Sequence, residues 1–222
     1  MARQGYAGDL TCTGSSACWA FGGWGYGKGS VSDECTGSLY AWADLSHTQF
    51  VLLALDTISG GTWESTTAED WIRRCQYPEG GFGYVPANSD YCWGKEPFGS
   101  TTAAEINSLI SLGVDSGNAV LDMAIGSMDE NYKVEQNPWH CLDRHYYYLW
   151  SLSRALSALE NEEQATEAHY DNWRSDITEL LLEAQWQDGR WRNEDDAHTE
   201  IPPDTLVTAH ALNTLFECLE RK

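Results

Sequence analysis

Four segments of the chain are apolar on nearly every side when their residues are placed on a helix. They are Asp44–Leu55, Thr101–Leu112, Asp143–Leu159 and Asp204–Leu219. Between them lie three amphipathic segments, about Thr66–Gln76, Ser116–Met128 and Tyr170–Trp186. A helix that is apolar all round is buried on both sides, whereas an amphipathic helix covers a core from one side. The pattern therefore predicts an all-α fold with an inner and an outer layer of helices.

Three of the four apolar segments open with an aspartate, namely Asp44, Asp143 and Asp204. A carboxylate at the start of a helix accepts hydrogen bonds from the free backbone N–H groups of the first turn. We therefore expect these aspartates to act as helix caps, and we expect almost no strands, because alternation with a period of two is nearly absent.

A short pattern recurs where an amphipathic segment is followed by an apolar one. Its copies are Gln185, Gly189 and Trp191, then Gln76, Gly80 and Phe82, and in part Gly22-Gly23-Trp24. A glycine permits a sharp reversal of the chain, and an aromatic ring can pack one pair of helices on the next. A pattern that recurs in this way is typical of a repeat protein, and we expect its residues to be structural.

The first part of the chain differs in composition from the rest. Residues 1–40 are rich in Gly and Ser and lack a helical period, so we expect an irregular segment before a repeat domain at 41–222. Cys12, Cys18 and Cys35 lie there, and disulfides among them would favour an extracytoplasmic location. No signal peptide is visible at the N-terminus, and no CxxC pair indicates a zinc knuckle.

The chain is strongly acidic. It has 13 Lys and Arg residues against 34 Asp and Glu residues, a formal net charge of −21. Nucleic acids and anionic membranes require a cationic surface, so the charge argues against both as partners. No apolar run is long enough for a transmembrane segment.

Several phrases of the sequence together resemble the prenyltransferase/squalene-cyclase repeat family. They are DLSHTQFVLLAL, GGFGYVP, GSTTAAEINSLISL, NPWHCLDRHYYYLWSL and QWQDGRW, in that order, between about Gly22 and Leu219. They look most like bacterial repeat proteins of this group whose function is largely uncharacterised. The resemblance implies an α/α toroid, a partial or complete barrel of helical hairpins in which the QW-type turns join an inner and an outer layer.

The toroid that the resemblance implies would be incomplete. The sequence supplies four inner and three outer helices, which leave such a ring open. Repeat domains bury their ends poorly unless those ends are capped. We therefore expect another chain or further repeats to complete the ring, with a homo-oligomer as one possibility, or else the Gly-rich N-terminal segment to close it.

The catalytic motifs of this family are not complete in the chain. Class II cyclases of the family use the middle aspartate of a D-x-D-D motif, and the nearest strings are Asn193–Asp196 and the sequence around Asp204. The candidates for a catalytic acid are Asp44, Asp143 and Asp204, all at starts of inner helices and so at one rim. A carboxylic acid that protonates an alkene needs a dry site that raises its pKa.

Protein prenyltransferases of the family bind zinc through Asp-x-Cys and a later Asp-x-x-His. The segment from Asp44 to His47 matches the second pattern, and Asp143-Arg-His145 resembles the first with His in place of Cys. The candidate zinc ligands are therefore His47, Asp143 and His145, although their order along the chain is reversed. Apart from this zinc hypothesis, we expect no cofactor.

Four aromatic residues, Tyr146, Tyr147, Tyr148 and Trp150, lie on one predicted inner helix. Neighbouring residues of a helix point in different directions. The four side chains could therefore line a cavity for an apolar or cationic guest, or simply pack a helix that is buried on both sides.

The motifs favour a repeat domain that acts as a binding or scaffold module, within a larger protein or assembly. One alternative is an enzyme that acts on an isoprenoid or other apolar substrate inside the ring, either cyclase-like or as a zinc-dependent transferase. A glycosidase on an α/α toroid would need two separated carboxylates, and this option also stays open.

Overall fold

The computed structural model describes residues 22–25, 31–32, 39–40, 43–60, 65–87, 96–139, 144–161, 170–192 and 203–219. Its helices are α1 (Leu45–Ser59), α2 (Thr66–Cys75), α3 (Gly99–Ser111), α4 (Ala119–Asn131), α5 (His145–Asn161), α6 (Trp173–Ala184) and α7 (Pro203–Cys218). Within these residues the only sheet is a short antiparallel pair, β1 (Val31–Ser32) and β2 (Leu39–Tyr40). The all-α prediction is therefore confirmed, and each predicted helix is present to within about one turn.

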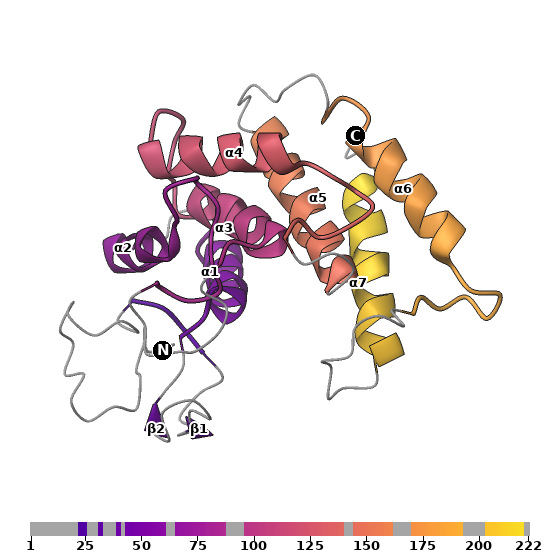
Figure 1. Ribbon diagram of the computed structural model, residues 1–222, viewed down its shortest axis with the longest axis horizontal. Coiled ribbons are helices and arrows are strands. Elements are labelled where there is room, and N and C mark those ends of the chain that lie inside the picture. Colours follow the sequence, from indigo (N-terminus) through magenta and orange to yellow (C-terminus); the bar gives the residue numbers. More distant parts are fainter. Residues whose placement is uncertain are drawn as a thin grey trace.

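Four helices pack side by side in the order in which they occur along the chain. Helix α1 packs against α3, α3 against α5, and α5 against α7. Helix α4 packs on α3, while α6 packs on α7 and more weakly on α5. Figure 1 shows the row of α1, α3, α5 and α7 in the middle of the molecule, with α2, α4 and α6 around it.

Burial along this row is uneven. Helices α3 and α5 are buried over most of their length, as predicted. The same prediction is wrong for α1 and α7, because each of them exposes large apolar side chains, such as Ile58 at 83% and Phe216 at 63%. The two helices stand at the ends of the row, so each has an inner neighbour on one side only.

The two described aspartates at predicted helix starts differ in their roles. Asp44 is the N-cap of α1, and its Oδ1 accepts the backbone N–H of His47 at 2.9 Å. Asp204 lies inside the first turn of α7, which begins at Pro203, so its predicted role as N-cap is wrong. Proline suits the first position of a helix because it has no N–H to satisfy. Asp143 lies outside the described residues.

The glutamine turns share one hydrogen bond. The side-chain amide of Gln76 donates to the carbonyl of Gly80 at 3.0 Å, and that of Gln185 donates to Gly189 at 2.9 Å. Both glycines have a positive φ, +89° for Gly80 and +81° for Gly189, which a residue with a side chain rarely adopts. Each glutamine therefore closes a turn that needs its glycine.

A second hydrogen bond ties each turn to the inner helix that follows it. The backbone N–H of the aromatic residue donates to a threonine Oγ1, and the pairs are Trp24 with Thr48 (3.0 Å), Phe82 with Thr102 (3.0 Å) and Trp191 with Thr208 (3.2 Å). The partial copy at Gly22-Gly23-Trp24 therefore has the same bond as the other two.

The connection between α4 and α5 lacks the Gln-Gly-aromatic pattern, since it contains Gln136 but no glycine. There the hydroxyl of Tyr148 donates to the carbonyl of Lys133 at 2.7 Å, and Nε2 of His145 meets the carbonyl of Val134 at 2.7 Å. A carbonyl only accepts, so this nitrogen of His145 carries a proton. Side chains at the start of α5 thus hold the connection that precedes it.

An outer helix covers two of the three glycine turns. A Cβ added at Gly22 would lie 2.3 Å from the carbonyl oxygen of Thr67 in α2, and one at Gly80 would lie 2.0 Å from that of Met123 in α4. A Cβ at Gly189 would meet nothing within 4 Å. The turn before α7 is therefore built like the others but is not covered by a helix among the described residues.

This difference predicts unequal costs for the same substitution. Gly80→Ala should lower the free energy of unfolding by about 2–4 kcal/mol, from backbone strain at positive φ plus overlap with α4. Gly189→Ala, the matched control, carries the strain alone and should cost about 1 kcal/mol. Urea unfolding of the two variants measures both values, and equal losses would mean that α4 does not rest on Gly80.

Candidate functional site

The start of α1 holds a buried carboxylate paired with an imidazole. Asp44 is fully buried, and its Oδ2 lies 2.6 Å from Nδ1 of His47, whose side chain is 22% exposed. The other carboxylate oxygen caps the helix, so both oxygens of Asp44 have partners. The pair orients the ring of His47 at the surface of the molecule, and a ring held in this way is suited to proton transfer.

Glu105 is a second buried carboxyl group, in the middle of α3. It is fully buried, and neither carboxyl oxygen has a hydrogen-bond partner among the described residues. Burial raises the pKa of Glu105 well above its usual range; the side chain of Ser108 acts against this shift, and the negative charge of Asp44 adds to it. Burial in this dry environment therefore favours the neutral acid form of Glu105.

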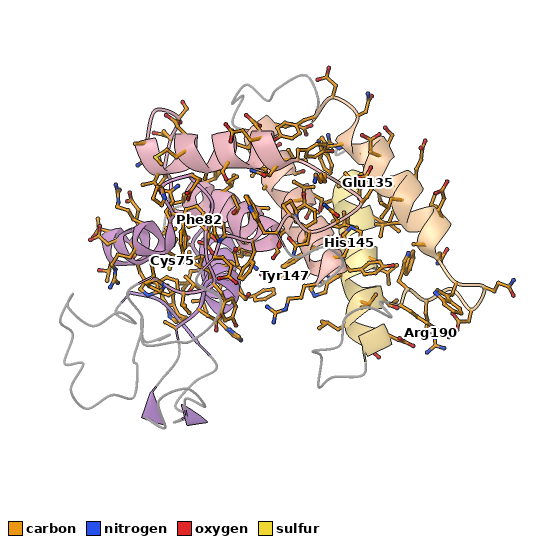
Figure 2. The ribbon with its side chains drawn as sticks, viewed as in Figure 1. Cys75, Phe82, Glu135, His145, Tyr147 and Arg190 are labelled. Carbon is orange, nitrogen blue, oxygen red and sulfur yellow. The ribbon has the colours of Figure 1, made fainter. Side chains whose placement is uncertain are left out.

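Tyr147 connects α5 to α1 through its hydroxyl group. Its hydroxyl accepts a hydrogen bond from the amide of Gln49 and donates one to Oγ of Ser46 at 3.3 Å. Tyr147 is labelled in Figure 2. Burial raises the pKa of Tyr147, which keeps the phenol protonated. The crevice lined by Tyr147, Arg144 and their neighbours has a volume of only about 10 Å³, about the space of one water molecule.

The other three aromatic residues of the predicted cavity are buried. Tyr146 is 8% exposed, Tyr148 1% and Trp150 7%. The hydroxyl of Tyr148 is engaged with the α4–α5 connection. The aromatic side chains of α5 therefore pack in the core of the inner row.

Trp150 is covered from both ends of the row. The ring of Phe50 in α1 stacks on it with a centroid separation of 5.3 Å, and the ring of His210 in α7 lies 5.4 Å away. His210 also meets Tyr147 at 5.6 Å, and burial lowers its pKa to about 4, so it is neutral at physiological pH. Aromatic side chains of α1, α5 and α7 thus fill the space where a guest would contact Trp150.

The three predicted zinc ligands are only partly described. His47 contacts Asp44, and Nε2 of His145 is engaged with the Val134 carbonyl in a buried setting that lowers the pKa of His145. Asp143 lies outside the described residues. No group of three or more His, Cys, Asp or Glu side chains among the residues with a described structure could hold a metal ion.

A larger pocket lies beside the last turns of all four inner helices, α1, α3, α5 and α7. It has a volume of about 420 Å³ and is half open, and its lining includes Asp56, Asn107, Arg154 and Glu217. The guanidinium of Arg154 stands 5.4 Å from the ring centroid of Trp150. A polar, open pocket of this kind suits a small hydrophilic molecule better than an isoprenoid.

Comparison of the sequence with protein-family models and with curated proteins finds no match. None of the helices in the described part of the chain combines the length and the apolar character that crossing a bilayer requires.

Sequence reasoning missed Glu105 and the three threonines. Glu105 sits in a helix predicted as apolar, and nothing in the residues around it separates a buried acid from an exposed one. Thr48, Thr102 and Thr208 each lie four residues after Asp44, Phe98 and Asp204, a spacing that could have been found by aligning the helix starts.

The raised pKa of Glu105 predicts a pH-dependent stability. A folded state that holds its proton more tightly than the unfolded chain loses stability as the pH rises from the ordinary glutamate pKa through the raised one. Glu105→Gln keeps the shape without the titration, so its free energy of unfolding should fall less steeply. The difference from the wild type should grow by up to about 1.4 kcal/mol per pH unit as the pH rises above the ordinary glutamate pKa of about 4.3 and toward the raised one.

Urea unfolding of both proteins across this pH range measures the difference. Glu179→Gln on the exposed side of α6 is the matched control, because it removes one charge without changing a buried group. Parallel profiles for the wild type and Glu105→Gln would show that Glu105 is not a buried neutral acid.

Proposed function

We propose that the chain is a repeat domain of the squalene-cyclase and prenyltransferase type, an arc of an α/α toroid that acts as a binding or scaffold module within a larger protein or assembly. The repeated turns support this kinship, because three of them use the same bond between an aromatic N–H and a threonine. The row of α1, α3, α5 and α7, with the other helices around it, supports the arc.

The observation that carries the proposal is an uncovered edge. We define the α7 edge as the turn Gln185–Arg192 together with the exposed face of α7. In the α2–α3 repeat, the amide of Gln76 also reaches the carbonyl of Val120 in α4, at 2.8 Å. Among the described residues, the side-chain amide of Gln185 has only its bond within the turn. The repeat at the α7 edge is thus built to receive a further helix.

The exposed face of α7 is apolar enough to bind a further helix. Leu206, Leu212, Phe216 and Leu219 are 37%, 54%, 63% and 65% exposed. Large apolar side chains that gather on one exposed face mark a site of protein interaction. The arginines of the turn, including Arg190 in Figure 2, pair with Asp188 and Asp204 at the rim of this edge.

Charges placed on this face should separate binding from folding. Leu212→Glu with Phe216→Glu alters two exposed positions, so the melting temperature should change by about 2 °C or less. Any complex that the wild-type protein retains after gentle isolation should lose its partner. Native mass spectrometry of both proteins, isolated in parallel, measures the loss.

Met123→Glu is the matched control, since Met123 is 43% exposed on α4 and lies away from the α7 edge. It should leave every complex intact. If the double variant kept all complexes, the α7 edge would not be a binding surface. If it unfolded instead, this face would belong to the core.

A second candidate is an enzyme that acts on an isoprenoid or other apolar substrate, and Glu105 is the observation that favours it. Alkene protonation requires a neutral, dry carboxylic acid, and Glu105 has this character. The crevice beside Tyr147, however, has room for only about one water molecule. Incubation with isoprenoid substrates tests this candidate, and a product that Glu105→Gln no longer forms would support it.

A zinc-dependent transferase that uses His47, Asp143 and His145 is a third proposal. It needs His145 to release the Val134 carbonyl. Elemental analysis of the purified protein tests it, because stoichiometric zinc that is lost in His47→Ala would support such a site.

A further inference from the structure

We propose that the α7 edge is completed by α1 of a second copy of this chain, in a head-to-tail contact. The inference rests on the proposed function, because it names the partner of the same edge. The surface on the second copy is the α1 face, which we define by the exposed side chains of Phe50, Ala54, Thr57 and Ile58.

The shared threonine bond allows α1 and α7 to be compared residue by residue. Thr48 and Thr208 accept the same hydrogen bond from the preceding turn, so the two helices can be aligned on them. Leu45, Gln49 and Leu52 then correspond to Thr205, Ala209 and Leu212, in that order. The first three are buried in α1, whereas all three counterparts in α7 are exposed. The face that α1 buries is therefore the face that α7 leaves open.

The reverse comparison gives the complementary result. Val207, Ala211 and Thr214 are the buried residues of α7, and in the alignment they correspond to His47, Val51 and Ala54. In α1, His47 and Val51 are half-buried and Ala54 is exposed. The face that α7 turns toward α5 is thus the one that α1 leaves more open.

Together the two faces form the two halves of one interface. Inside the chain, α1 packs on α3 and α7 packs on α5, and in each helix the buried residues lie on the face compared above. An α7 edge set against the α1 face of another copy would repeat this internal packing across the boundary between chains. Such a contact joins two different surfaces, so it is heterologous and leads either to a closed ring or to an open filament.

The charges of the two faces agree with this pairing. The chain carries 34 acidic residues, yet none of the exposed positions of α1 or α7 is charged among the residues with described side chains. The charged side chains of the turn, Asp188, Arg190 and Arg192, pair with one another, so the two helix faces can meet without burying an unpaired charge. The net charge of −21 still repels copies at long range, and salt screens this repulsion. Association of the protein should therefore strengthen as the salt concentration rises.

A mixing experiment tests the head-to-tail contact. One variant, Leu212→Glu with Phe216→Glu, blocks the α7 edge, and another, Ala54→Glu with Ile58→Glu, blocks the α1 face. Each variant alone has no complete interface and should be monomeric in light scattering, at concentrations from about 1 to about 100 μM. An equimolar mixture retains one intact interface, so it should form a dimer of one chain of each kind, while the wild type forms larger assemblies.

Several outcomes would overturn the proposal. If the α1 variant alone still dimerised, the contact would be symmetric and formed by α7 with α7. If the wild type stayed monomeric at every concentration, also at about 1 M salt where the Debye length is about 3 Å, a second copy would not be the partner. Circular dichroism checks that both variants fold, and the salt series on the wild type decides the matter if one does not.

The two proposals fail in different ways. If the wild type is monomeric but a complex with another protein depends on the α7 edge, the binding function stands and the second copy is wrong. If the mixed dimer forms, both stand. If no complex of any kind depends on the α7 edge, both fail.

Discussion

The fold depends on one repeated hydrogen bond, from the backbone N–H of an aromatic residue to a threonine hydroxyl at the start of the next inner helix. The threonines are Thr48, Thr102 and Thr208. A buried backbone N–H must find an acceptor, and the threonine supplies one inside the packed interface. The same contact brings the aromatic ring against the helix, where Phe82 and Trp191 are almost fully buried. Turn, ring and helix are thereby held in one arrangement that the chain uses three times.

This arrangement explains why the two ends of the molecule differ from its middle. A hairpin in the row offers a glycine turn to the outer helix that follows and a helix face to the next inner helix. In the middle of the row, α4 and α5 occupy these places. At the α7 end of the row, no helix among the described residues occupies either place, and the apolar side chains of α7 are exposed. The exposed surface therefore follows from repetition itself and suits a function in binding.

Glu105 of α3 and the aromatic rings around Trp150 are not part of this repeated arrangement, and burial determines their character. The burial of Glu105 outweighs the opposing effect of Ser108 and raises the pKa of Glu105, which favours its neutral form. Trp150 lies between Phe50 and His210, and the same packing that buries these rings leaves little room for a substrate. Burial therefore decides the character of both groups: it favours the neutral form of Glu105 and packs the rings around Trp150.

The sequence by itself determined the helices, the turns and the acidic surface. Helical periodicity and the Gln-Gly-aromatic pattern are local signals, because they depend on residues within a turn or two of one another. Only the tertiary structure decided which threonine meets which aromatic residue, since their separations are 24, 20 and 17 residues. It also decided that Glu105 is buried and that Leu212 and Phe216 are exposed. Burial depends on which helices stand on either side, and the composition of one helix does not contain that information.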